Sequence, residues 1–270
     1  AVHRMQIHTS GELTRILNAE GHLRDVVIQG VSLRSHVELL RNSDVLGAVF
    51  LGCDLDASTA GELVSRGAIV FSNVDERPYD PYRARLYTPE ELYDGFDPDV
   101  PESIADTLDQ KVYAHWLQTG REWPNLIEGL MRRLHDLAMS DAKTDLLTQD
   151  VRAVAVMGGH ALSRTDPRFV DVVHIGRGLA LRGFLPVSGG GPGAMEATHL
   201  GAYLCESPPE QVHEAVRMLS EAPRYDHPLW LSTAMRPTKQ SRGSKWMATA
   251  TRRAKAASRR IISPPSTTCA

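Results

Sequence analysis

The sequence has little cysteine, no long apolar run and no acidic residue near its C-terminal end. Its three cysteines, Cys53, Cys205 and Cys269, are scattered, and none lies near another cysteine or a histidine at zinc-ligand spacing. This pattern excludes a disulfide framework and a zinc motif, and it fits a reducing compartment. No run approaches the roughly 18 apolar residues of a transmembrane helix, and residues 1–17 lack the apolar core of a signal peptide. We therefore expect a cytoplasmic protein with no membrane partner and no metal site.

The acidic residues end at Asp226, although the whole chain carries 33 of them against 30 Lys and Arg. Residues 227–270 hold nine of the basic residues, which leaves 21 basic against 33 acidic residues before them. Such a break indicates a different type of segment. Residues 236–270 also have almost no apolar periodicity, so we expect a basic, disordered tail. The tail has no interleaved aromatic residues and no recognisable motif, and we do not expect a nucleic-acid partner.

Residues 1–110 predict a small α+β region. Three short apolar runs, at 26–31, 46–51 and 68–71, are bounded by turn residues, as buried or half-buried strands are. The run AVFLGCDL resembles one rung of a coiled parallel β-structure, although a single rung favours an ordinary sheet. Residues 73–101 are rich in Pro, Asp and Tyr, and we expect a long connection there with at most one short helix, at 89–93.

Apolar residues at helical spacing follow this connection. His115 and Trp116 lie on one helical face, and Pro124 then interrupts the pattern. A second amphipathic helix of about five turns is predicted after Asn125, its N-cap, with Glu128 in the capping-box position. We assign its apolar stripe to the core; the stripe consists of Leu126, Ile127, Leu130, Met131, Leu134, Leu137 and Ala138.

Residues 152–205 alternate predicted strands, glycine turns and helices. In order, the elements are a strand over 153–157, the turn Gly158-Gly159, a helix with an apolar stripe between 169 and 180, a strand over 184–187, a turn over 188–193, and a helix from Ala194. The strand over 153–157 is fully apolar, which is typical of a strand covered on both faces. Gly183 closes the first helix from the position just beyond its C-terminus.

Both glycine turns are expected at one edge of a parallel sheet, because the helix between the two strands crosses over. Ligands of open α/β sheets bind at that edge. Glycine lets backbone N–H groups approach an anion, and a helix N-terminus adds partial positive charge. The turn is neither a G-x-G-x-x-G pattern nor a P-loop. We expect Gly193, Ala194 and Met195 to direct amides at a phosphate, with a hydroxyl contact from Ser188; the alternative is a tight structural turn.

The segments VMGGH and SGGGPGAMEATHLGAY, with GREWPNLIEGL upstream, resemble the LOG family, long mislabelled as lysine decarboxylases. The resemblance covers about residues 110–235 and implies a Rossmann-like domain over 111–235, a parallel sheet with flanking helices that is incomplete at its C-terminal end. It also implies a homodimer that hydrolyses nucleoside 5′-monophosphates to a free base and ribose 5-phosphate without a cofactor. The expected partner is a nucleoside monophosphate or a similar phosphorylated small molecule. The residues implied to bind the nucleotide are Gly158, Gly159, His160, Ser188, Gly189, Gly190, Gly191, Gly193, Ala194, Met195 and Glu196.

The chain departs from the family at the second motif, P-G-G-x-G-T-x-x-E, which is absent. In the family, the glutamate of that motif contacts the ribose and takes part in cleavage, so we assign no catalytic residue here. We expect Glu196 to be a helix N-terminal residue favoured by the dipole, and Arg164 to be a solvated loop residue.

Two functions therefore stay open. The first is a nucleotide hydrolase of the LOG type, and the second is a module that binds a nucleotide without cleaving it. The basic tail stands where the missing strands belong, and we expect it to result from a frameshift or a premature stop. An incomplete sheet leaves apolar edges and faces uncovered, so we expect a destabilised product.

Overall fold

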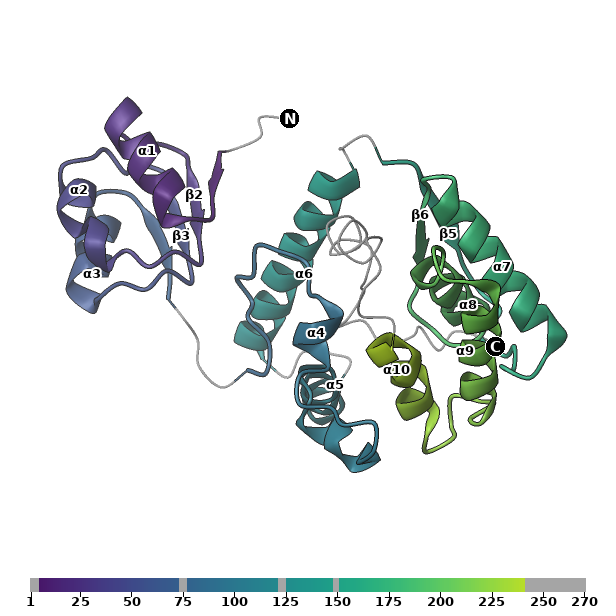
Figure 1. Ribbon diagram of the computed structural model, residues 1–270. Coiled ribbons are helices and arrows are strands. Elements are labelled where there is room, and N and C mark those ends of the chain that lie inside the picture. The colour runs from purple at the N-terminus through teal and green to yellow at the C-terminus, as the bar shows by residue number, and fades with distance from the viewer. Residues whose placement is uncertain (1–4, 73–76, 121–124, 148–150, 241–270) are drawn as a thin grey trace. The chain divides into compact units, whose positions relative to one another are not determined.

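The computed structural model describes residues 5–72, 77–120, 125–147 and 151–240, and the chain divides into two compact units (Figure 1). The first unit contains residues 1–85 and 123–139, and the second contains residues 86–122 and 140–270. Both are mixed α/β: the first holds a parallel sheet of four strands and the second a parallel pair. None of the helices in these ranges combines the length and the apolar character that crossing a bilayer requires.

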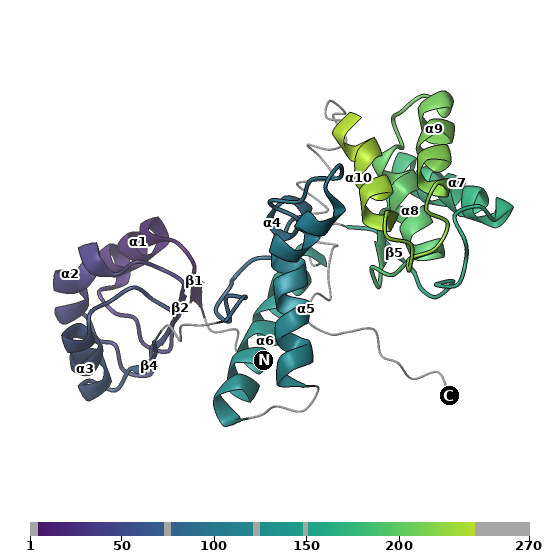
Figure 2. The same ribbon diagram turned by 90° about the horizontal axis from the view of Figure 1, so that it is seen from below.

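The first unit is built on a parallel sheet whose strands follow one another in chain order. Gln6 pairs with Val27, Val27 with Val49 and Val49 with Ile69, so successive turns of the chain take 21, 22 and 20 residues. The α-helices between the strands lie on one side of the sheet (Figures 1 and 2). The elements are β1 (Gln6–Ile7), α1 (Ser10–Glu20), β2 (Val27–Gln29), the 3-10 helix η1 (Arg34–His36), α2 (Val37–Arg41), β3 (Val49–Leu51), α3 (Ala57–Ser65) and β4 (Ile69–Phe71).

The core of this unit lies between the sheet and its helices. The strand register aligns Ile7, Ile28 and Phe50, and all three are fully buried. Leu13 of α1 and Leu63 of α3 belong to the same apolar cluster. Each turn of the chain thus contributes a strand residue and a helix residue to one continuous core.

The α+β expectation for this region is wrong in its topology, because strands and helices alternate and all neighbouring strands are parallel. The coiled parallel structure, which AVFLGCDL suggested, describes the arrangement better, and β3 lies within that run. Parallel neighbours need a crossover connection, and a short helix provides each one here. β1 and the helices α1 to α3 were not predicted. A strand of two residues, such as β1, shows almost no alternation in its sequence.

The first part of α6 (Leu126–Leu147) belongs to this unit and begins as predicted. Asn125 Oδ1 accepts a hydrogen bond of 2.8 Å from the Glu128 N–H. The side chain of Glu128 is buried and accepts hydrogen bonds from Arg77 (3.0 Å) and Arg132 (2.8 Å). Burial and the adjacent Glu128 carboxylate raise the pKa of the Tyr79 phenol.

The core assignment of the α6 stripe is wrong for most of the residues that were named. Met131 is buried, but Leu126 is 85% exposed, and Ile127, Leu130 and Leu137 are exposed as well. The helix instead buries a face on which Glu128 forms ion pairs with Arg77 and Arg132. Periodicity finds an amphipathic helix but does not show which face is covered.

The second unit contains the predicted strand–helix–strand–helix segment. β5 pairs in parallel with β6, with Val156 opposite Ser188, and helices follow each strand. The elements are α4 (Pro89–Leu92), the 3-10 helix η2 (Pro101–Asp106), α5 (Leu108–Thr119), β5 (Ala153–Val156), α7 (Pro167–Leu181), β6 (Leu185–Ser188), α8 (Ala194–Tyr203), α9 (Pro209–Ser220) and α10 (Trp230–Gln240).

α7 and α8 pack closely because glycine lies on both helices at their contact. A Cβ on Gly176 would overlap the Thr198 carbonyl, and a Cβ on Gly201 would overlap the Val173 carbonyl. Around this contact, an apolar cluster extends from α7 through α8 to α9; its buried residues are Phe169, Val173, Ala197, Leu204, Val212, Ala215, Val216 and Leu219.

The expectation that β5 is covered on both faces is wrong. Ala153 and Ala155 are exposed, and Val154 and Val156 are half-buried. Within the described residues, β6 is the one strand paired with β5. The predicted tail starts inside α10, which continues to Gln240, and residues 241–270 lie outside the described residues.

Candidate functional site

The two glycine turns of the second unit meet at the carboxyl edge of β5 and β6. The Ala194 N–H donates a hydrogen bond of 3.1 Å to the Gly159 carbonyl, and the Leu162 N–H donates to the same oxygen at 3.1 Å. A Cβ on Gly193 would overlap that carbonyl. Two segments that are about 30 residues apart therefore form one backbone surface, as a parallel pair with a helical crossover requires.

Four glycines give this surface its shape. Gly158, Gly159, Gly190 and Gly193 have φ values of +84°, +66°, +75° and +73°. This is the left-handed region, where a side chain is strained and glycine is not. A Cβ would meet nothing within 4 Å at Gly158 or Gly190, so those two positions face open space.

The N-terminus of α8 opens onto the same surface. Gly193 is its N-cap residue, no side chain caps it, and the Ala197 N–H donates to the Gly193 carbonyl at 2.9 Å. The amides of Met195 and Glu196 precede that bond and have no acceptor within the helix. An anion at this position would meet unpaired donors and the positive end of the helix dipole.

Two of the expected donors are already engaged. The Ala194 amide is bound to Gly159, and so it does not point at a ligand as predicted. The Ser188 Oγ accepts a hydrogen bond of 3.0 Å from the Gly190 N–H and lies 2.7 Å from His199 Nε2. Burial lowers the pKa of His199, which favours a neutral ring beside the serine. The Ser188 side chain therefore stabilises the turn through hydrogen bonds within the protein.

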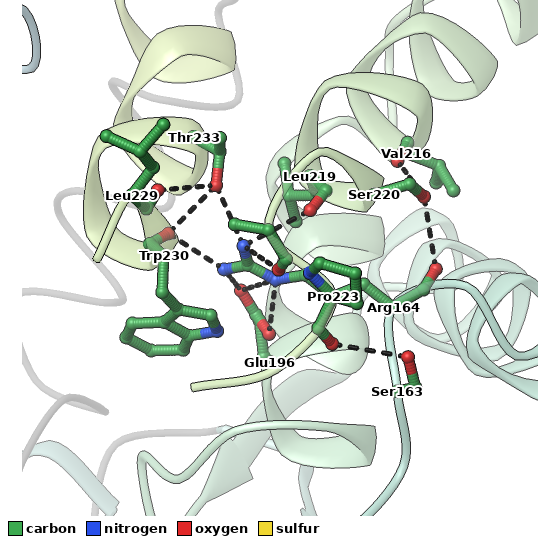
Figure 3. A network of polar contacts seen from close by, with 11 residues as sticks. Ser163, Arg164, Glu196, Val216, Leu219, Ser220, Pro223, Leu229, Trp230 and Thr233 are labelled. Carbon is green, nitrogen blue, oxygen red and sulfur yellow. Dashed lines mark hydrogen bonds and ion pairs between the residues drawn. The ribbon is translucent and has the colours of Figure 1, made fainter. Parts of the chain in front are cut away.

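Arg164 is not a solvated loop residue, contrary to the expectation. Its side chain is 1% exposed and forms an ion pair with Glu196 at the start of α8 (Figure 3). The Arg164 Nε donates to both Glu196 oxygens, at 3.1 and 3.2 Å, and its Nη2 donates to Oε1. Glu196, 13% exposed, thus has a structural partner.

The rest of the Arg164 guanidinium is bound by α10 and by the segment that ends α9 (Figure 3). Nη1 donates to Thr233 Oγ1 at 2.8 Å, Nη2 donates to the Trp230 carbonyl at 3.1 Å, and the Trp230 ring centroid lies 4.8 Å from Cζ. Nη1 also donates to the carbonyls of Leu219 and Ala222. One buried cation, in the loop that follows the first glycine turn, therefore joins that loop to α8, α9 and α10.

The other polar residues near the first turn have clear positions. His160 is exposed in the turn after β5. Asp166 is the N-cap of α7, and its ion pair with Arg168 holds the pKa of the carboxyl at about 2. Sequence reasoning assigned no role to His199 or Trp230, because their partners, Ser188 and Arg164, are set by packing rather than by spacing.

No family model, no curated protein and no solved structure matches this chain. Among the described residues, no group of three or more His, Cys, Asp or Glu side chains is placed to hold a metal ion. The site itself offers backbone amides and a closed Arg164–Glu196 pair.

Proposed function

We propose that the chain binds a nucleoside 5′-monophosphate, or a similarly phosphorylated small molecule, at the two glycine turns. The observation that carries this proposal is the direct contact of the turns, in which Gly159 accepts the Ala194 N–H beside the uncapped N-terminus of α8. Helix N-termini and glycine turns at the carboxyl edge of a parallel sheet are the usual phosphate sites of α/β proteins.

The proposal includes a relation to the LOG family and a Rossmann-like arrangement of the second unit. The order β5, α7, β6, α8 and the parallel pairing support that arrangement. The residues proposed to surround the phosphate are Gly158, Gly159, His160, Ser188 to Gly191 and Gly193 to Glu196. The homodimer that the resemblance implies, and the cytoplasmic location expected from the sequence, are part of the same proposal.

Binding without turnover is favoured over hydrolysis by two observations. Cleavage of an N-glycosidic bond passes through a cationic sugar, which a nearby carboxylate has to stabilise. Glu196 is the carboxylate at the α8 N-terminus, and Arg164 engages both of its oxygens. The motif that supplies the family's catalytic glutamate is absent from the sequence.

Incubation with AMP, GMP, CMP and UMP separates the two functions. We expect at least one nucleotide to bind, measured by calorimetry, and no free base to accumulate, measured by chromatography. Release of base and ribose 5-phosphate in equal amounts would instead establish the hydrolase. Absence of binding by all four nucleotides, by ribose 5-phosphate and by inorganic phosphate would refute the site.

Gly190→Ala tests where the phosphate binds. We expect at least about a tenfold loss of nucleotide affinity, because the new methyl group enters the open space above the turn and strains a left-handed residue. Gly95→Ala is the matched control, since Gly95 also has a left-handed φ and nothing within 4 Å. Equal affinities for the two variants would place the ligand elsewhere.

A further inference from the structure

Met157 is an exposed apolar side chain beside the proposed phosphate site. It follows β5 directly and precedes Gly158, and 69% of its surface is exposed. No other large apolar side chain in the described part of the second unit is more exposed. A methionine in this position contributes little to a core, and burying it would be favourable.

The side chain of Met157 leans across the second glycine turn. A Cβ built on Gly189 would lie 3.4 Å from Met157 Cε and 3.5 Å from Met195 Sδ. Met195 itself is buried, and its methyl group would lie 2.5 Å from a Cβ on Gly191. Two thioethers therefore border the turn, one buried beneath it and one exposed at its side.

The apolar border of the turn is separate from its polar contacts. Ser188 directs its hydroxyl to His199 of α8, whereas Met157 and Met195 both lie next to Gly189. Of these two thioethers, Met157 is the exposed one. It therefore borders the open side of the turn, where a ligand held by its phosphate could extend an apolar group.

We infer that Met157 is a specificity-determining residue that packs against the base of the bound nucleotide. This inference rests on the proposed nucleotide site. Methionine sulfur and methyl groups make favourable contacts with aromatic rings, and the flexible side chain adapts to rings of different size. A sugar phosphate has no ring of this kind, so Met157 gives the site a preference for nucleotides over ribose 5-phosphate.

The test compares two probes on Met157→Ala. We expect the affinity for AMP to fall roughly 3- to 10-fold, the range that a sulfur–aromatic contact supports, while the affinity for ribose 5-phosphate changes less than about twofold. Met157→Leu should retain most of the AMP affinity, because it keeps the apolar volume. Met5→Ala is the control, since Met5 is also an exposed methionine and lies in the first unit.

Each outcome is decisive. Unchanged AMP affinity in Met157→Ala, with wild-type binding of both probes, would overturn the role of Met157 and leave the phosphate site standing. Equal losses for AMP and ribose 5-phosphate would also overturn it, because the effect would then not depend on the base. Failure of the wild-type protein to bind AMP, ribose 5-phosphate or inorganic phosphate would refute the proposed function itself.

Discussion

Replacing Arg164 by methionine is expected to lower the free energy of unfolding by about 3–5 kcal/mol. The substitution leaves Glu196, a carboxylate that is only 13% exposed, without its cation. It also removes the hydrogen bonds that Thr233, Trp230, Leu219 and Ala222 accept from the guanidinium. Unpaired polar groups of this kind cost more than the pair contributes when it is intact. Urea unfolding followed by circular dichroism measures the change.

A second substitution separates the charge from the packing. In the double variant Arg164→Met/Glu196→Met, no unpaired ion remains, and we expect a substantial part of the lost stability to return. Arg168→Met is the control, because Arg168 is 77% exposed and its ion pair with Asp166 should be worth no more than about 1 kcal/mol. A double variant that loses the sum of the two single losses would contradict this explanation.

Gly201→Ala is expected to destabilise the second unit by about 2–3 kcal/mol, although alanine is the better helix former. The new methyl group would overlap the Val173 carbonyl and lie 2.8 Å from the Arg177 nitrogen. Both are backbone atoms of α7, and relief requires the two helices to separate. Thermal unfolding by calorimetry measures the effect.

Gly178→Ala, on the partner helix α7, provides the comparison. Its Cβ would lie 3.1 Å from the end of the flexible Arg182 side chain, which can move aside. We expect no loss and a gain of up to about 1 kcal/mol from the higher helix propensity of alanine. Equal destabilisation by the two substitutions would show that the α7–α8 contact is looser than described.

The elements of residues 153–203 could be predicted from the sequence almost to the residue. An apolar run, two glycines, a helical stripe and a second apolar run leave few alternatives, and Gly183 is left-handed just beyond α7, as expected. α9 was not predicted from the sequence. Its spacing of Val212, Val216 and Leu219 was the available signal.

The environment of Arg164 could not be predicted in the same way. Whether an arginine is solvated or buried depends on the groups around it, and here these come from α8, α9 and α10. The same limit applies to Ser188, whose partner His199 is one turn along α8. Sequence spacing identified the glycine turns but not the side chains that fix them.

The regular repeat of the first unit bears on how the length of that unit can change. In an array where each repeat contacts its neighbours, stability is close to a sum over adjacent repeats. Gln6, Val27, Val49 and Ile69 occupy equivalent places in successive repeats. Duplication of one such segment in frame would lengthen the array without altering the spacing of its ladder, so natural or engineered variants of different length could keep the same architecture.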